Sequence, residues 1–121
     1  MAQVAYLVQD LLFTSKIREA AHQLGVDVQS ARNPEALVLA ARQARLVIVD
    51  LRLVEALEAL DRLAADPEAA RAPSVGFVDH ERTDVMQEAR ARGCGRVMAK
   101  GEFASGLPAL LQSTRDCVSG R

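Results

Sequence analysis

The stretch that decides the fold is LVIVD, residues 46–50, which runs on into LRL at residues 51–53. Four apolar residues, Leu46 to Val49, follow one another without interruption, which is typical of a strand buried on both faces of a parallel sheet. Asp50 then places a single carboxylate directly after the strand. In open parallel sheets, ligands bind beyond the carboxyl ends of the strands, so Asp50 is predicted to be functional.

Similar apolar runs recur on both sides of this strand, each followed by a segment with helical spacing of apolar residues. The other strands are predicted at residues 4–8, 26–28, 74–78 and 96–99. Helices are predicted at residues 15–24, from Pro34 behind an Asn33 cap, at 54–65, at 83–91, and from 102 or 103 to 113. Gly25 is predicted to stop the first helix, and residues 66–73 are predicted to form a loop.

Strand and helix thus alternate five times, which predicts an α/β protein with helices on both faces of a parallel sheet. With five strands, the common solution is the flavodoxin-like (βα)5 sandwich with strand order 2-1-3-4-5. The 121 residues suit one domain, predicted over residues 1–113, with a polar and frayed tail at residues 114–121.

The composition excludes several classes of protein. The net charge is −1, so there is no electrostatic basis for binding nucleic acid or an anionic membrane surface. No apolar run is long enough to cross a bilayer, and the N-terminus lacks the features of a secretory signal. Cys94 and Cys117 have no metal-binding spacing and are predicted to be ordinary thiols of a cytoplasmic protein.

The residues that directly follow the strands should meet at one edge of the sheet. They are Gln9 and Asp10 after the first strand, Asp50 after the third, Val78 and Asp79 after the fourth, and Lys100 after the fifth. Two carboxylates, Asp10 and Asp50, and the ammonium of Lys100 are therefore predicted to converge. Such a group suits Mg²⁺ and a phosphoryl group, because Mg²⁺ prefers oxygen ligands and a carboxylate can form an acyl phosphate.

In this order and spacing, VIVD at residues 47–50 and VMAK at residues 97–100 make the chain similar to the receiver domains of bacterial response regulators. The Gly-rich approach to the last strand, ARARGCGRVMAKGEF, adds to the resemblance, which spans roughly residues 3–113. It implies a non-enzymatic signalling domain with Asp50 as phosphoacceptor and Lys100 as the invariant lysine. It also implies a histidine kinase or a downstream signalling protein as partner, and docking or homodimer formation through residues 83–113.

The sequence departs from the receiver pattern at the residues around Asp50. Receivers carry two adjacent acids after the first strand, whereas this chain has Gln9 and Asp10, or Val8 and Gln9 in the other register. The two switch positions, a hydroxyl residue after the fourth strand and an aromatic residue in the fifth, fall on Val78 and Val97. With Asp10 and Asp50 as its only acidic ligands, any Mg²⁺ site should be weak.

These departures favour a pseudo-receiver that acts by protein–protein interaction. A working phosphoacceptor in a two-component relay is the main alternative, and a small-ligand-binding flavodoxin-like protein is a second. Bland roles for the same residues also stay open: a salt bridge between Asp50 and Lys100, a helix cap or a Lys100 partner at Asp10, and a helix cap at Asp79.

Overall fold

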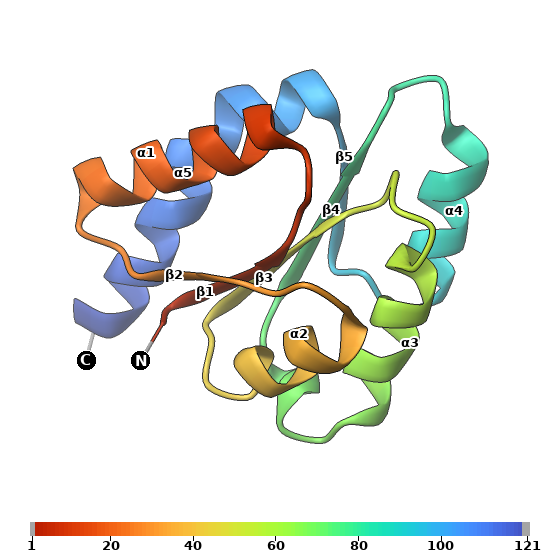
Figure 1. Cartoon of the computed structure of the whole chain (residues 1–121), viewed down its shortest axis with the longest axis horizontal. Coiled ribbons are helices and arrows are strands. Elements are labelled where there is room, and N and C mark those ends of the chain that lie inside the picture. Colours follow the sequence, from red (N-terminus) through yellow and green to blue (C-terminus); the bar gives the residue numbers. More distant parts are fainter. Residues whose placement is uncertain (1, 120–121) are drawn as a thin grey trace.

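A five-stranded parallel sheet runs through the middle of the protein (Figure 1), and its strand order is β2-β1-β3-β4-β5. The computed structural model describes residues 2–119, with the side chains of the last helix described up to Arg115. The strands are β1 (Val4–Leu7), β2 (Val28–Ser30), β3 (Leu46–Asp50), β4 (Ser74–Val78) and β5 (Arg96–Ala99). The helices are α1 (Leu11–Leu24), α2 (Pro34–Ala41), α3 (Ala56–Ala65), α4 (Thr83–Ala91) and α5 (Lys100–Ser119), with a short 3-10 helix η1 (Ala69–Arg71). The predicted flavodoxin-like fold and strand order are confirmed.

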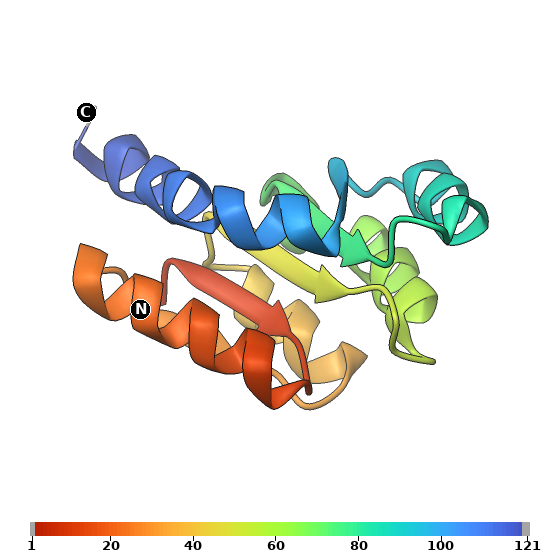
Figure 2. The ribbon, with the colours of Figure 1, turned by 90° about the horizontal axis from the view of Figure 1, so that it is seen from above.

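The helices form two layers, with α1 and α5 on one face of the sheet and α2, α3 and α4 on the other (Figures 1 and 2). Side chains of β3 alternate between these layers. Ile48 joins Phe13 and Phe103 in the core under α1 and α5, whereas Val49 joins Leu37 and Leu60 under α2 and α3. Because every residue of LVIVD is buried, the central strand needs apolar side chains on both faces.

Local capping explains where the first two helices begin and end. The Asp10 side chain accepts the backbone N–H groups of Leu12 and Phe13, so α1 starts at Leu11. Asn33 caps α2 in the same way, with Pro34 at the first helical position, as predicted. Gly25 ends α1 with φ of 69°, a left-handed conformation that glycine adopts without the strain of a side chain.

Three element boundaries were predicted wrongly on the N-terminal side of the chain. Helix α1 begins four residues earlier than predicted, because its first turn exposes Leu11 and Leu12 and so lacks an amphipathic pattern. Strand β2 spans Val28–Ser30 instead of 26–28, since the Val26 N–H still bonds back to the carbonyl of Ala21 in α1. Helix α3 begins at Ala56, two residues later than predicted.

The last helix is longer than predicted at both ends. It begins at Lys100, directly after β5, and continues to Ser119 with Pro108 inside it. Thr114 was expected in a frayed tail, yet its side chain is buried and its hydroxyl donates to the Leu111 carbonyl. Helix therefore covers residues 114–119 of the expected tail, and residues 120–121 lie outside the described part of the chain. Within residues 2–119, no helix is long and apolar enough to span a membrane.

Candidate functional site

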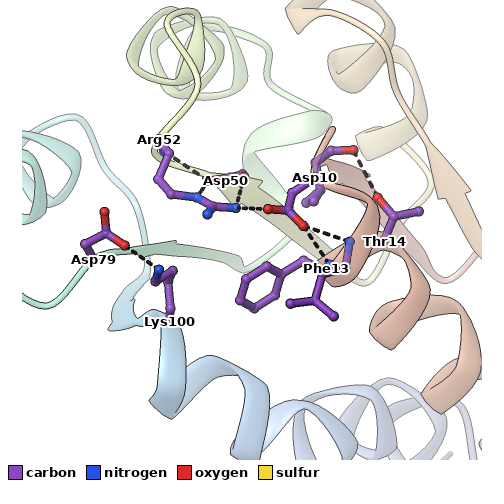
Figure 3. Close-up of polar contacts among 9 residues, drawn as sticks. Asp10, Phe13, Thr14, Asp50, Arg52, Asp79 and Lys100 are labelled. Carbon is purple, nitrogen blue, oxygen red and sulfur yellow. Dashed lines mark hydrogen bonds and ion pairs between the residues drawn. The ribbon is translucent and has the colours of Figure 1, made fainter.

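The carboxyl ends of β1, β3, β4 and β5 bring five charged side chains to one edge of the sheet (Figure 3). Asp10 follows β1, Asp50 ends β3, Arg52 lies in the loop after β3, Asp79 follows β4, and Lys100 begins α5. These side chains form two ion-paired groups: Arg52 with Asp50 and Asp10, and Lys100 with Asp79. The sequence predicted the edge and four of its members, but not how they pair.

Arg52 binds the carboxylate of Asp50 through both its guanidinium and its backbone N–H. Its Nε donates to Oδ1 at 2.9 Å and its Nη2 to Oδ2 at 2.8 Å, and its backbone N–H donates to Oδ1 at 3.0 Å. Asp50 is only 2% exposed, so these bonds replace the water that an isolated carboxylate would need. In return, the hydrogen bonds from Arg52 to Asp50 raise the pKa of the guanidinium further above its usual range.

Asp10 has two roles at this edge. Its Oδ1 caps α1, and its Oδ2 accepts a hydrogen bond from Arg52 Nη2 at 3.3 Å. The N–H of Phe13, then that of Leu12 and the Arg52 guanidinium, lower the pKa of Asp10. Of the open readings for Asp10, the helix cap is therefore confirmed. Of the two residues that follow β1, Asp10 is the one that joins the cluster. Arg52 lies between its carboxylate and that of Asp50 (Figure 3).

Lys100 turns to Asp79 instead of Asp50. Its Nζ lies 2.7 Å from Asp79 Oδ1, and both side chains are partly exposed. This hydrogen bond, with a smaller contribution from the charges of Arg52 and Arg82, lowers the pKa of Asp79. Lys100 lies at the predicted edge, but its ion pair is with Asp79, so the alternative pairs of Lys100 with Asp50 or with Asp10 are wrong. Asp79 is also not the cap of α4, whose N-cap position is Arg82.

Three phenylalanines form an apolar floor beneath the ion pairs. Phe77 stacks on Phe103 with ring centroids 4.4 Å apart, and Phe13 lies 4.8 Å from Phe77. The guanidinium carbon of Arg52 lies 5.3 Å from the centroid of Phe13 and 5.6 Å from that of Phe77. Cation–π attraction adds about 0.5–1 kcal/mol at such distances and keeps the guanidinium over the rings. The rings are packing groups, as predicted.

The remaining predicted positions do not contribute polar groups to the cluster. Gln9 is exposed and its Nε2 reaches the carbonyl of Arg32, 3.5 Å away, beyond the end of β2. Val78 is buried in the core under α3 and α4, and Val97 packs against the same core. Neither valine can donate or accept a hydrogen bond at the edge.

The sequence reasoning missed Arg52, the residue that organises the site. A signal for it existed, since Asp50-Leu51-Arg52 places a basic residue two positions after the acid, where a turn can return its side chain to the strand end.

The residues of this edge do not fit the Mg²⁺ that the receiver resemblance implies. A Mg²⁺ site needs several oxygen ligands in octahedral geometry, and the carboxylates of Asp10 and Asp50 already accept hydrogen bonds from the Arg52 guanidinium. Adding a dication beside that guanidinium would oppose like charges. Among the described residues, no group of three or more acidic, histidine or cysteine side chains could hold a metal ion.

Solved structures of response regulators and receiver domains match the chain over most of its length. The chain aligns with the chemotaxis response regulator CheY4 of Vibrio cholerae at a TM-score of 0.77 and 17% identity, covering 94% of this chain and 98% of that one. The chain has the receiver fold. A response regulator from Hahella chejuensis gives a TM-score of 0.77 at 18% identity, with 94% and 95% of the two chains covered.

A further structure with the receiver fold carries a metal ion. It is the receiver domain of a sensor histidine kinase from Pseudomonas aeruginosa with magnesium coordinated in its active-site cleft. Its TM-score is 0.73 at 20% identity, over 93% of this chain and 97% of that chain. No protein-family model and no curated protein sequence matches the chain. The receiver fold therefore rests on shape, and the roles of individual residues rest on the geometry described above.

Proposed function

We propose that this protein is a receiver-like module of two-component signalling that acts by binding another protein, with Asp50 held unphosphorylated by Arg52. The observation that carries the proposal is the bidentate ion pair between Arg52 and Asp50, reinforced by the Arg52 backbone N–H. A guanidinium in this position supplies a permanent positive charge to Asp50 and Asp10 without a metal ion.

The ion pair opposes phosphorylation for two reasons. Both oxygens of Asp50 accept charge-assisted hydrogen bonds from Arg52, and these bonds make the carboxylate a weaker nucleophile toward phosphorus. Phosphoryl transfer also depends on positive charge around the transferred group, which metal ions commonly supply. Here Asp79 adds a negative charge at the same edge and holds the Lys100 ammonium.

The two switch positions also lack side chains that could respond to a phosphoryl group on Asp50. A switch needs side chains that interact differently in its two states. Val78 and Val97 offer neither a hydroxyl group nor an aromatic ring. We therefore infer that the fold presents one constant surface to its partner, a histidine kinase or a downstream signalling protein.

The proposed partner surface comprises α4, β5 and the first part of α5, residues 83–113. It carries exposed charges of both signs, including Asp84, Arg90, Arg96 and Glu102. Mixed charges on a partner surface favour specific over tight binding. Homodimer formation through the same surface is the other use of these residues that the receiver fold suggests.

Phosphorylation chemistry tests the central claim. Wild-type protein and the Asp50→Asn variant are incubated with Mg²⁺ and acetyl phosphate, and the intact mass is followed with time. We expect no phosphoryl adduct on wild-type protein under conditions that label an ordinary receiver run in parallel. An adduct that forms on wild-type protein and not on Asp50→Asn would overturn the proposal and establish the alternative, a working phosphoacceptor in a two-component relay.

A further inference from the structure

A cavity of about 170 Å³ lies where α3, η1 and the turn after α4 meet the sheet. These elements belong to the helix layer that covers one face of the sheet (Figure 1). The inner wall of the cavity comes from core side chains that are more than nine-tenths buried, Val47 of β3 and Leu60 and Leu63 of α3. Protein interiors are packed so closely that voids larger than a water molecule are few. A space of this size against core side chains is therefore a candidate ligand site.

Small residues keep the cavity open. Four alanines line it, Ala64, Ala69, Ala70 and Ala72, and none of them extends beyond its Cβ atom. Gly93 lines it too, and a Cβ atom built at Gly93 would have no other atom within 4 Å. Ala64, Ala70 and Gly93 are exposed, so the cavity opens to solvent between α3, η1 and the turn after α4. Side chains of ordinary size at these positions would fill the space.

The two polar side chains that line the cavity already have partners. Ser74 Oγ accepts the Gly95 N–H at 2.9 Å. Arg92 Nε donates to Glu88 at 3.1 Å, and Arg92 Nη1 donates to Asp61 across the gap between α4 and α3. Among the described residues, no buried side-chain nitrogen or oxygen lacks a hydrogen-bond partner. The cavity therefore offers a ligand mainly apolar contact.

The charges at the opening favour an uncharged ligand. Asp61 and Glu88 together outweigh the single charge of Arg92, so an anion would be repelled. A cation that left water for the aliphatic wall would lose its hydration without gaining a partner. Ordered water also needs two to four polar partners, and the polar side chains here are already engaged. Water in the cavity should therefore be displaced readily by an apolar molecule.

We propose that this cavity binds a small uncharged apolar molecule, such as an aromatic ring of about the size of benzene. An apolar cavity of about 150 Å³ is large enough for benzene, which fits the volume found here. The site is separate from the ion pairs at the sheet edge, since Val47 precedes Asp50 by three residues, or about 10 Å along the strand. The proposal is independent of the phosphorylation state of Asp50.

Benzene is the probe for the first test. It is titrated into ¹⁵N-labelled wild-type protein while amide shifts are followed by NMR. We expect saturable shifts in three segments that are remote in sequence but surround the cavity, residues 60–64, 69–72 and 92–94. Benzene should also raise the Tm, because it binds only the folded protein. Benzoate and benzylammonium carry the same ring with a charge, and each should bind at least tenfold more weakly.

The second test fills the cavity from within. Ala69→Leu and Ala72→Leu each add three carbon atoms at its wall, and both should abolish the benzene shifts. Ala109→Leu is the control, because it enlarges an alanine of α5 in the opposite helix layer and should leave the benzene affinity unchanged. A circular dichroism melt shows whether each variant is folded. Two filling variants keep the test decisive if one of them does not fold.

The melts also test whether the space exists. Adding carbon atoms to a well-packed core is destabilising, whereas adding them to a cavity is not. We therefore expect at least one of Ala69→Leu and Ala72→Leu to melt at or above the Tm of wild-type protein. A steep loss of Tm in both variants would show that no such cavity is present.

Three binding results would also overturn the proposal. Benzene that causes no saturable shift around the cavity, up to its solubility limit, is not a ligand of this site. Shifts that persist in both Ala69→Leu and Ala72→Leu place the benzene elsewhere on the protein. Benzoate that binds as tightly as benzene would identify Arg92 as an anion site and exclude the uncharged class of ligand.

Discussion

Arg52 shows how one side chain can change the chemistry of a whole site. Its guanidinium carries a permanent single charge and has a planar fork of donors that matches the two oxygens of a carboxylate. With Asp50 only 2% exposed, the pair neutralises a carboxylate that would otherwise be costly to bury. The ring faces of Phe13 and Phe77 then hold the guanidinium from the other side. Arg52 thus supplies a fixed positive charge to both carboxylates.

Replacing Arg52 with methionine should destabilise the folded protein, because the buried Asp50 carboxylate loses its ion-pair partner. The buried carboxylate of Asp50, and that of Asp10 beside it, would lose the guanidinium that pairs with both. Loss of one partner of a buried pair typically costs 3–5 kcal/mol, and we expect about 3 kcal/mol here because Arg52 is itself partly exposed. Urea unfolding measures this loss. Arg82→Met is the matched control, because Arg82 pairs with the exposed Asp84, and it should cost less than about 1 kcal/mol.

The same variant tests whether Arg52 excludes divalent cations. We expect millimolar Mg²⁺ to raise the Tm of Arg52→Met, because two carboxylates then face the site without a competing cation. The Tm of wild-type protein and of Arg82→Met should not change. Equal stabilisation of all three proteins by Mg²⁺ would show that Arg52 does not control access to the carboxylates.

At the scale of elements, the sequence predicted best where burial is uniform. The apolar runs of β1, β3 and β4 are almost entirely buried, and their bounds agree with the prediction to within one residue. The prediction of helix bounds failed where apolar side chains are exposed, because the hydrophobic periodicity is interrupted there. Leu11 and Leu12 are apolar but face solvent in α1, so the hydrophobic periodicity that marks a helix begins only after them. The far end of α5 was hidden for the opposite reason, since polar Thr114 is buried.

The start of α1 depends on Asp10, and two substitutions separate its cap from its charge. Asn at residue 10 can still accept the backbone N–H groups of Leu12 and Phe13, whereas Ala cannot. Both variants lose the attraction to Arg52. We therefore expect Asp10→Ala to be about 1 kcal/mol less stable than Asp10→Asn in urea unfolding, which is the typical contribution of an N-cap. Equal stabilities would mean that the first turn of α1 forms without its cap.

At the scale of the whole molecule, topology was predictable and pairing was not. Strand order alone brings Asp10, Asp50, Asp79 and Lys100 to one edge, and that much followed from the alternation of strands and helices. Which acid each cation meets depends on side-chain direction and on competition between neighbours. Asp79 forms an ion pair with Lys100, whereas Asp50 forms its ion pair with Arg52. A one-dimensional pattern contains no information about that competition.

The edge cluster and the surface ion pairs together predict how stability depends on pH. Four aspartates have a lowered pKa in the folded protein: Asp10 through the N–H of Phe13, Asp66 through Arg42, Asp79 through Lys100, and Asp84 through Arg82. A carboxylate with a lowered pKa binds fewer protons in the folded state than in the unfolded state, so stability rises with pH while these groups titrate. Their contribution is complete above the unfolded pKa of about 4 and is lost as pH falls below it.

We therefore expect the urea midpoint to be steady from about pH 7 to about pH 5 and to fall steeply below about pH 4. Salt provides the control, because these aspartates lie near the surface and their ion pairs are screened at high ionic strength. In about 1 M NaCl the urea midpoint should fall less as the pH is lowered. The backbone hydrogen bonds to Asp10 should then account for a larger share of the remaining pH dependence. A midpoint that stays level down to about pH 3 would show that these carboxylates are equally well solvated in the folded and unfolded chains.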